Sequence, residues 1–226
     1  MFAKLASGPE IFTIDPARIG GEIIRQAAAI LRSGGVVIYP TETFYALGAV
    51  PWNEKAVERI FEIKNRDAGK ALPLIASELK AAVSSASQWP RPAGTLARLF
   101  WPGPLSLIVP ASSSLPSALH AGTGKVAVRV SSHPVASLLA KACGGLIVST
   151  SANVSGGPAV QSPDSLDSAL LASVQAVVDG GNLPGGFPST IVDVTVYPVA
   201  LVREGKIDFE KISRALGVSP ERFAPR

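Results

Sequence analysis

The segment PTETFYALG (Pro40–Gly48) places three hydroxyl side chains and a carboxylate directly after the apolar run VVIY. A segment that only reverses the chain is usually rich in Gly, Asn or Pro. Here Thr41, Thr43 and Tyr45 offer hydrogen-bond donors and acceptors, and Glu42 offers a negative charge. Because ligands of open α/β sheets bind at the carboxyl ends of strands, this composition predicts the rim of a binding site.

Further polar clusters stand at comparable places along the chain. STSANVSGG (149–157) follows the apolar run at 146–148, and REG (203–205) follows the one at 199–202. PST (188–190) begins a predicted strand, and it reaches the same rim if that strand runs antiparallel. One such cluster is an ordinary turn, but several on one rim predict a site.

The segment KNRDAGKALPLI carries Lys64, Arg66 and Lys70 just past a predicted helix. Two interpretations are open for these cations. They complement the negative end of the helix dipole, or they form a cationic arm over a phosphate or carboxylate. The cluster Ser149–Asn153 has two interpretations as well, a capped turn or a loop that cradles phosphate.

Several well-known site motifs are missing from the sequence. It contains neither G-x-x-x-x-G-K-[ST] nor G-x-G-x-x-G, so a nucleotide site here is not of the Walker or Rossmann type. His120 and His133 have no metal-like spacing, and no Ser-His-Asp order is compelling. The lone cysteine, Cys143, stands in an apolar run, which predicts a buried side chain.

Composition narrows the class of protein. Hydrophobic residues make up 47% of the 226 residues and charged residues 17%, which favours a sizeable core over disorder. A net charge of +4 favours an anionic substrate or a nucleic acid. The basic residues are scattered rather than interleaved with aromatics, which counts against a dedicated nucleic-acid binder. Since no uncharged apolar run approaches the length of a membrane span, we expect a soluble, cytoplasmic protein.

Strands and helices alternate along the chain, which predicts an α/β fold with a largely parallel or mixed sheet. Asp15-Pro16 predicts the start of the first helix, Gly34-Gly35 its end, and Asn53 the cap of the second. The segment 112–125 is the most loop-like. We expect further helices at 93–100, 134–143 and 209–216, and strands at 36–39, 72–76, 105–109, 126–130, 146–149, 174–178, 190–194 and 199–202.

The ordered motifs resemble one known family. GGVVIYPTETFYALGA, KNRDAGKALPLI, WPGPLSLIVP, VAVRVSSHP, STSANVSGGPA, PSTIVDVT and LVREGKI occur in the order typical of YrdC-like threonylcarbamoyl-adenylate synthases. The resemblance covers roughly residues 14–209 and is to the short form, without an extra C-terminal domain. It implies a single domain over 1–226, with a twisted, open mixed sheet flanked by helices around a deep basic cavity.

The resemblance also implies an activity. Such proteins condense L-threonine, bicarbonate and ATP, with Mg²⁺, into threonylcarbamoyl-AMP and pyrophosphate. The product passes to a transferase that makes N6-threonylcarbamoyladenosine in tRNA. The implied roles are catalytic for Lys64, Arg66, Ser151 and Asn153; threonine-binding for Thr41, Thr43, Tyr45 and Arg129; and nucleotide-binding for Lys64, Arg66, Ser149, Ser151, Asn153, Ser189, Thr190 and Arg203. No protein side chain is implied as a metal ligand.

Two positions depart from the family pattern, Ala46 where Gly is usual and Asp67 where Pro is usual. We expect Ala46 to limit close approach of the backbone and Asp67 to weaken the grip of Arg66 on phosphate. Two other functions remain open. One is an RNA-binding paralogue that contacts tRNA, double-stranded RNA or the ribosome. The other is a carbamoyl-adenylate-forming domain, which occurs in longer hydrogenase maturation proteins.

Overall fold

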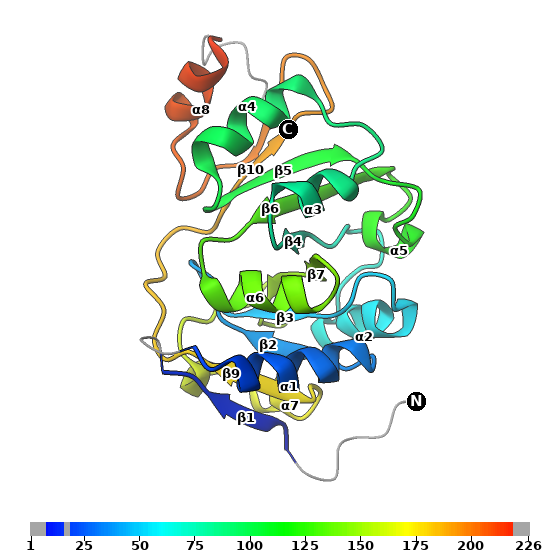
Figure 1. Ribbon diagram of the computed structural model, residues 1–226, viewed down its shortest axis with the longest axis vertical. Coiled ribbons are helices and arrows are strands. Elements are labelled where there is room, and N and C mark those ends of the chain that lie inside the picture. The colour runs from blue at the N-terminus through cyan, green and yellow to red at the C-terminus, as the bar shows by residue number, and fades with distance from the viewer. Residues whose placement is uncertain (1–7, 16–18, 219–226) are drawn as a thin grey trace.

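The structure is a computed structural model that describes residues 8–15 and 19–218. It contains two adjoining mixed sheets with helices packed against them (Figure 1). The α/β class with mixed sheets flanked by helices is therefore confirmed, and the strands are divided between two sheets. The chain passes from one sheet to the other around Ser149, between a strand that ends at Val148 and a strand that begins at Thr150.

The first sheet has five strands and carries the PTETFYALG segment. Its first three strands run parallel, whereas β3 and β8 run antiparallel to their neighbours. Helices α1 (Gly21–Arg32) and α6 (Pro134–Ala142) pack together on one face of it. The strand order is β1 (Glu10–Thr13), β9 (Ala176–Asp179), β2 (Val37–Tyr39), β3 (Ala46–Gly48) and β8 (Thr150–Ser151).

The second sheet has six strands, and one of its faces packs under helices. Those helices are α3 (Leu79–Ser84), α4 (Arg91–Phe100) and α8 (Phe209–Leu216). The strand order is β11 (Ala200–Arg203), β10 (Thr190–Asp193), β5 (Leu105–Pro110), β6 (Lys125–Val130), β4 (Leu74–Ala76) and β7 (Leu146–Val148). β10 and β11 form the antiparallel pair that brings PST and REG to one end of the sheet.

Local sequence signals explain most element ends. The Asn53 side chain accepts a hydrogen bond from the Ala56 amide at 3.1 Å and caps α2 (Glu54–Lys64) as predicted. Gly34 takes the positive φ of 92° that ends α1. Helix α1 begins at Gly21, later than predicted, and Pro16, its expected first residue, lies outside the described residues.

Some elements were not predicted from the sequence. The segment 112–125 includes the one-turn helix α5 (Ser117–His120) and the first residue of β6, so it is not simply a loop. The other unpredicted elements are β1, β3, β8, α3, the 3₁₀ turn Pro163–Ser165 and α7 (Ser168–Leu171). No helix within 8–15 or 19–218 has the length and apolarity needed to cross a membrane. Cys143 is buried as predicted.

Candidate active site

A cavity of about 860 Å³ opens where the two sheets meet. That volume is within the range typical of pockets for ligands, roughly 300–1,000 Å³. All the side chains to which the sequence assigned a role line this cavity, except Lys64 and Thr190. Segments far apart in sequence thus converge on one site. From the predicted set, the lining includes Thr41, Thr43, Tyr45, Arg66, Arg129, Ser149, Ser151, Asn153, Ser189 and Arg203.

The floor of the cavity is the face of the six-stranded sheet that the helices leave uncovered. On β6, Lys125, Ala127 and Arg129 face the cavity, whereas the valines between them lie in the core. β5 and β10 repeat this alternation, because successive side chains of a strand point to opposite faces. On β5 the cavity-facing residues are Ser106 and Ile108. On β10 they are Ile191 and Asp193, and Ser189, just before this strand, faces the cavity too.

The cavity is strongly cationic. Among its described lining residues Arg66, Lys125, Arg129 and Arg203 are basic, and Asp193 alone is acidic. Burial, together with the nearby charge of Arg129, lowers the pKa of Arg203. Burial likewise lowers the pKa of Arg66. Positively charged side chains that are close together and partly buried destabilise one another's charged forms. A polyanionic ligand would offset this repulsion, so the arrangement is suited to binding one.

Lys64 does not line the cavity but supports one of its walls. It is the last residue of α2, 1% exposed, and its ammonium points at the loop that follows β8. Nζ donates to the Asn153 carbonyl at 2.6 Å, to Asn153 Oδ1 at 3.1 Å and to the Ser151 carbonyl at 2.5 Å. Burial, with a smaller effect of Arg66, lowers the pKa of Lys64 to about 8. All three donors of the ammonium are therefore used by the protein itself.

The loop supported by Lys64 presents Ser151 and Asn153 to the cavity. The Ser151 hydroxyl donates to Asn153 Oδ1 at 2.5 Å, and the Asn153 amide group donates to the Gly157 carbonyl. The amide of Ala152 donates to the Tyr45 carbonyl at 2.9 Å, which ties the loop to the PTETFYALG segment. The two motifs predicted to share a rim are thus hydrogen-bonded neighbours.

Hydrogen bonds within the protein already engage much of the PTETFYALG segment. The Thr41 hydroxyl donates to the Phe44 carbonyl at 2.7 Å and accepts from the amides of Thr43 and Phe44. The Tyr45 hydroxyl donates to the Gly181 carbonyl at 2.8 Å, and burial raises its pKa to about 12. Thr41 and Tyr45 therefore shape the wall. The Thr43 hydroxyl also lines the cavity, 3.1 Å from that of Thr41. Because the Thr41 proton is used on the Phe44 carbonyl, Thr43 donates to Thr41 and offers a ligand its acceptor lone pairs.

The motifs PST and REG contact each other through hydrogen bonds and contribute to the lining of the cavity. Arg203 donates to the Ser189 carbonyl through Nε at 3.1 Å and through Nη2 at 2.8 Å. Thr190, which is fully buried, exchanges hydrogen bonds with the backbone of Ile207. A Cβ on Gly205 would lie 2.2 Å from the Pro188 carbonyl oxygen, so only glycine fits this contact. Thr190 is therefore part of the support of the site rather than its lining.

One pair of cavity residues, Lys125 and Asp193, was missed from the sequence. Lys125 Nζ lies 3.0 Å from Asp193 Oδ2. Although burial acts to raise it, hydrogen bonds from Thr195 and Lys125 lower the pKa of the Asp193 carboxyl. The signal was present, since Lys125 begins a strand in which valines alternate with other residues and Asp193 stands between two buried valines.

The two departures from the family pattern have simple settings. Ala46 lies within β3 opposite Tyr39, is 4% exposed and does not have a positive φ. Asp67 Oδ1 accepts from the Gly69 amide at 2.9 Å and forms no ion pair with Arg66. Arg66 is instead held by the carbonyls of Lys70 and Ala71 at 3.3 and 3.0 Å. Neither departure removes a residue of the cationic cavity.

Comparison with known proteins identifies the family of the chain. Residues 29–205 match the family model for Sua5, YciO and YrdC, which is described as "Telomere recombination". The chain belongs to the Sua5/YciO/YrdC family. The match begins before PTETFYALG and ends at the last residue of REG.

Relatives within the Sua5/YciO/YrdC family include proteins named threonylcarbamoyl-AMP synthase. One from Alkalilimnicola ehrlichii is 44% identical over 182 residues, which are 79% of this chain and 89% of that protein. One from Pyrococcus abyssi is 37% identical over 194 residues, which are 86% of this chain but only 57% of that protein. The chain thus spans little more than half of this longer relative.

Solved structures of the family share the fold. P. abyssi Sua5 in complex with L-threonine has a TM-score of 0.88 and 34% identity, over 96% of this chain and 62% of that one. Escherichia coli YciO has a TM-score of 0.83 and 30% identity, over 90% of this chain and 99% of that one.

Proposed function

We propose that the chain is an L-threonylcarbamoyladenylate synthase, a nucleotidyltransferase that makes threonylcarbamoyl-AMP and pyrophosphate from L-threonine, bicarbonate and ATP. The observation that carries this proposal is the cationic cavity, which gathers Arg66, Arg129 and Arg203 from three separate segments. Relatives that carry this name, and the threonine-bound Sua5, support it. We take residues 14–209 as the catalytic unit.

The reaction needs no nucleophile from the protein. The threonine amine attacks the carbon of bicarbonate, and loss of water leaves a carbamate. A carbamate oxygen then attacks the α-phosphorus of ATP, and the bond to the bridging oxygen breaks to release pyrophosphate. The protein contributes positioning and charge stabilisation. The cavity offers both, since its cations lie on two sides of a pocket large enough for ATP.

The described residues divide between contact and support. Arg66, Ser149 and Arg203 line the cavity as candidates for the nucleotide, and Thr43 and Arg129 as candidates for threonine. Ser151 and Asn153 complete the wall between them. Lys64 acts through that wall rather than on phosphate, because its ammonium is fully engaged by backbone and amide oxygens.

Magnesium is proposed to enter with ATP. The one carboxylate of the described lining, Asp193, already accepts hydrogen bonds from Lys125 and Thr195. No group of three His, Cys, Asp or Glu side chains placed to hold a metal ion occurs in the described ranges. We therefore propose that the phosphates of ATP, its natural ligands, hold the Mg²⁺.

The product is proposed to serve a separate transferase that modifies tRNA to N6-threonylcarbamoyladenosine, in the cytoplasm where ATP and tRNA meet. Direct RNA binding is not favoured as the main function, because four basic side chains line a concave pocket and the other lysines and arginines are scattered along the chain. An affinity for RNA that falls steeply with salt would instead indicate the RNA-binding alternative.

The test is synthesis by the purified chain. With threonine, bicarbonate, ATP and Mg²⁺ we expect equimolar pyrophosphate and threonylcarbamoyl-AMP, measured by phosphate release and mass spectrometry. Arg66→Ala and Arg203→Ala are expected to lose at least 10²-fold in turnover, by analogy with removal of one stabilising donor. Arg25→Ala removes a surface arginine, paired with Glu22, and serves as the matched control. Absence of both products from the folded wild-type chain refutes the proposal.

A further inference from the structure

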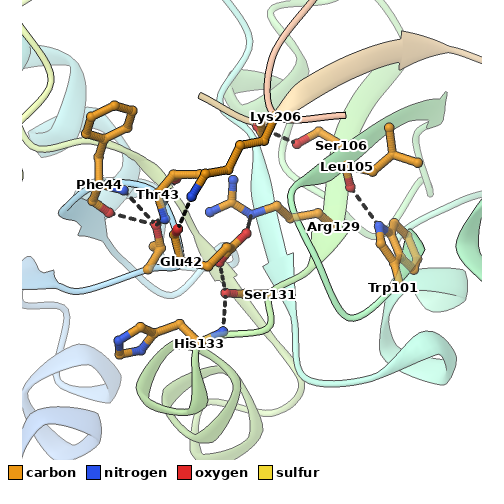
Figure 2. A network of polar contacts seen from close by, with 12 residues as sticks. Glu42, Thr43, Phe44, Trp101, Leu105, Ser106, Arg129, Ser131, His133 and Lys206 are labelled. Atoms are coloured by element: carbon orange, nitrogen blue, oxygen red, sulfur yellow. Dashed lines mark hydrogen bonds and ion pairs between the residues drawn. The ribbon is translucent and has the colours of Figure 1, made fainter. Parts of the chain in front are cut away.

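Glu42 of the PTETFYALG segment is a buried carboxylate that the reaction does not directly need. Its side chain is 11% exposed and lies beside that of Arg129, which is 10% exposed. Glu42 Oε1 and Arg129 Nε are 3.4 Å apart (Figure 2). The two residues come from different sheets, since Glu42 follows β2 and Arg129 belongs to β6. The pair therefore spans the junction on which the cavity opens.

The other carboxylate oxygen of Glu42 is held by Ser131. The Ser131 hydroxyl donates to Glu42 Oε2, while the same hydroxyl oxygen accepts from the His133 amide at 3.1 Å (Figure 2). Because the amide proton occupies the Ser131 oxygen, the hydroxyl proton is directed to the carboxylate. Ser131 is fixed in turn by α6, whose Ser137 hydroxyl donates to the Ser131 carbonyl at 2.9 Å. The orientation of the carboxylate is thus set by a chain of contacts to a helix.

This arrangement holds Arg129 by one edge only. Its Nε faces Glu42 and is buried without a hydrogen bond of good geometry. Neither terminal nitrogen of Arg129 has a hydrogen bond to any described residue or is among the buried unpaired atoms, and Arg129 lines the cavity. The edge with two terminal nitrogens is the one that binds carboxylate or phosphate in a bidentate manner. That edge is left free for a ligand.

The negative charge of Glu42 also permits two arginines to face one cavity. Arg203 is close enough to Arg129 that its pKa is lowered by burial and by the Arg129 charge. Arg203 donates to neutral oxygens of Ser189, and these oxygens supply no negative charge to balance the two arginines. Buried cations without a partner are costly. Glu42 therefore makes the guanidinium of Arg129 tolerable at this place as well as fixing its direction.

We propose that Glu42 is a positioning residue of the synthase site, which, anchored by Ser131, aims the free edge of Arg129 at an anionic oxygen of a substrate. The proposal rests on the proposed function for the reaction it serves. The anionic oxygen belongs either to the carboxylate of threonine or to a phosphate of ATP. The two sources share one chemistry, and kinetics distinguishes them.

The experiment compares Glu42→Gln, which keeps the shape but removes the charge, with Ser131→Ala, which keeps the charge but removes its anchor. For both we expect the KM of one substrate, threonine or ATP, to rise roughly tenfold, while kcat changes much less. Glu42→Asp is expected to recover part of the loss. Glu62→Gln removes a half-exposed carboxylate from the Arg59 pair on α2 and is the matched control.

The outcomes separate this proposal from the proposed function. Unchanged KM values for both substrates in folded Glu42→Gln and Ser131→Ala, with an active wild type, overturn the role of Glu42 alone. If Glu42→Gln does not fold, Ser131→Ala decides. If the wild type makes no product, calorimetric titration with threonine and with ATP gives the same comparison: roughly tenfold weaker binding in the variants supports the role of Glu42, and equal binding overturns it.

Discussion

The ammonium of Lys64 and the side-chain oxygen of Asn153 lie 3.1 Å apart, and the same ammonium lies 2.6 Å from the carbonyl oxygen of Asn153. One lysine thus holds a residue of the cavity wall by backbone and side chain together. Lys64→Met keeps the volume but leaves these buried oxygens without a donor, at a cost of about 1–3 kcal/mol. We expect loss of stability of that size in urea unfolding, and loss of turnover.

The matched control for Lys64→Met is Lys80→Met, which removes an exposed ammonium from α3 and is expected to behave as wild type. Lys64→Arg is expected to restore little, because a planar fork cannot point three donors at one loop. Wild-type stability in Lys64→Met contradicts the supporting role.

Alkaline pH provides a second test of Lys64. Its pKa in the folded chain, about 8, lies below the ordinary value of 10.5. The unfolded chain therefore binds more protons between these pH values, and the free energy of unfolding rises with pH across this window. Between about pH 8 and about pH 9.5 we expect a gain of about 1–2 kcal/mol relative to Lys64→Met. Parallel pH profiles of the two proteins, from urea unfolding, contradict the lowered pKa.

Gly205→Ala tests the contact between REG and PST. The new Cβ would lie 2.2 Å from the Pro188 carbonyl oxygen and 2.7 Å from the Thr190 amide nitrogen, both backbone atoms that cannot rotate away. Overpacking of this kind costs about 1–3 kcal/mol, which is expected as a lower melting temperature. Gly8→Ala, whose Cβ meets nothing within 4 Å, is the control. Equal melting temperatures show that the segment relaxes freely.

Acid unfolding tests Asp193. Although its burial acts in the opposite direction, hydrogen bonds from Thr195 and Lys125 lower the pKa of this carboxyl in the folded chain. The stabilisation it provides is therefore present above the unfolded pKa and is lost as pH falls through the folded one. Asp193→Asn is expected to be less stable near neutral pH and to lose less stability below about pH 4.

The control for Asp193→Asn is Asp208→Asn, which alters an exposed ion pair with Lys211. Its acid profile, from circular dichroism at graded pH, is expected to follow that of the wild type. A profile of Asp193→Asn that also follows the wild type contradicts the lowered pKa.

Element types were predictable where the signals were local. Asn53, Gly34 and the apolar runs of β5 and β6 lie within a few residues of the structure they determine. β8 was missed because Thr150 pairs with the distant Leu47, and no local pattern encodes pairing across a hundred residues. β3 pairs with the nearby β2, but its three residues, Ala46–Gly48, are too few to show a strand pattern. The split into two sheets depends on the same non-local pairing.

The sequence predicted which motifs form the site, but not which of their residues line the cavity and which support its walls. The sequence placed Lys64 and Arg66 together, yet one supports a loop and the other lines the cavity. Lys64 ends α2, and Asn65, in the αL conformation, turns the chain before Arg66. Which oxygen each cation meets is decided by packing, and sequence spacing alone does not contain that information.

The alternation of core and cavity residues on β5, β6 and β10 has a consequence for how such a pocket can evolve. Inserting or deleting one residue in β6 would exchange the two faces, burying Arg129 among valines and turning Val128 to the ligand. Insertions and deletions, which readily diversify sites made of loops, are therefore not tolerated in the strands that form the floor of this cavity. The ligand preference of the pocket can therefore change only by substitution of the cavity-facing residues, because the apolar core fixes which residues of each strand face the cavity.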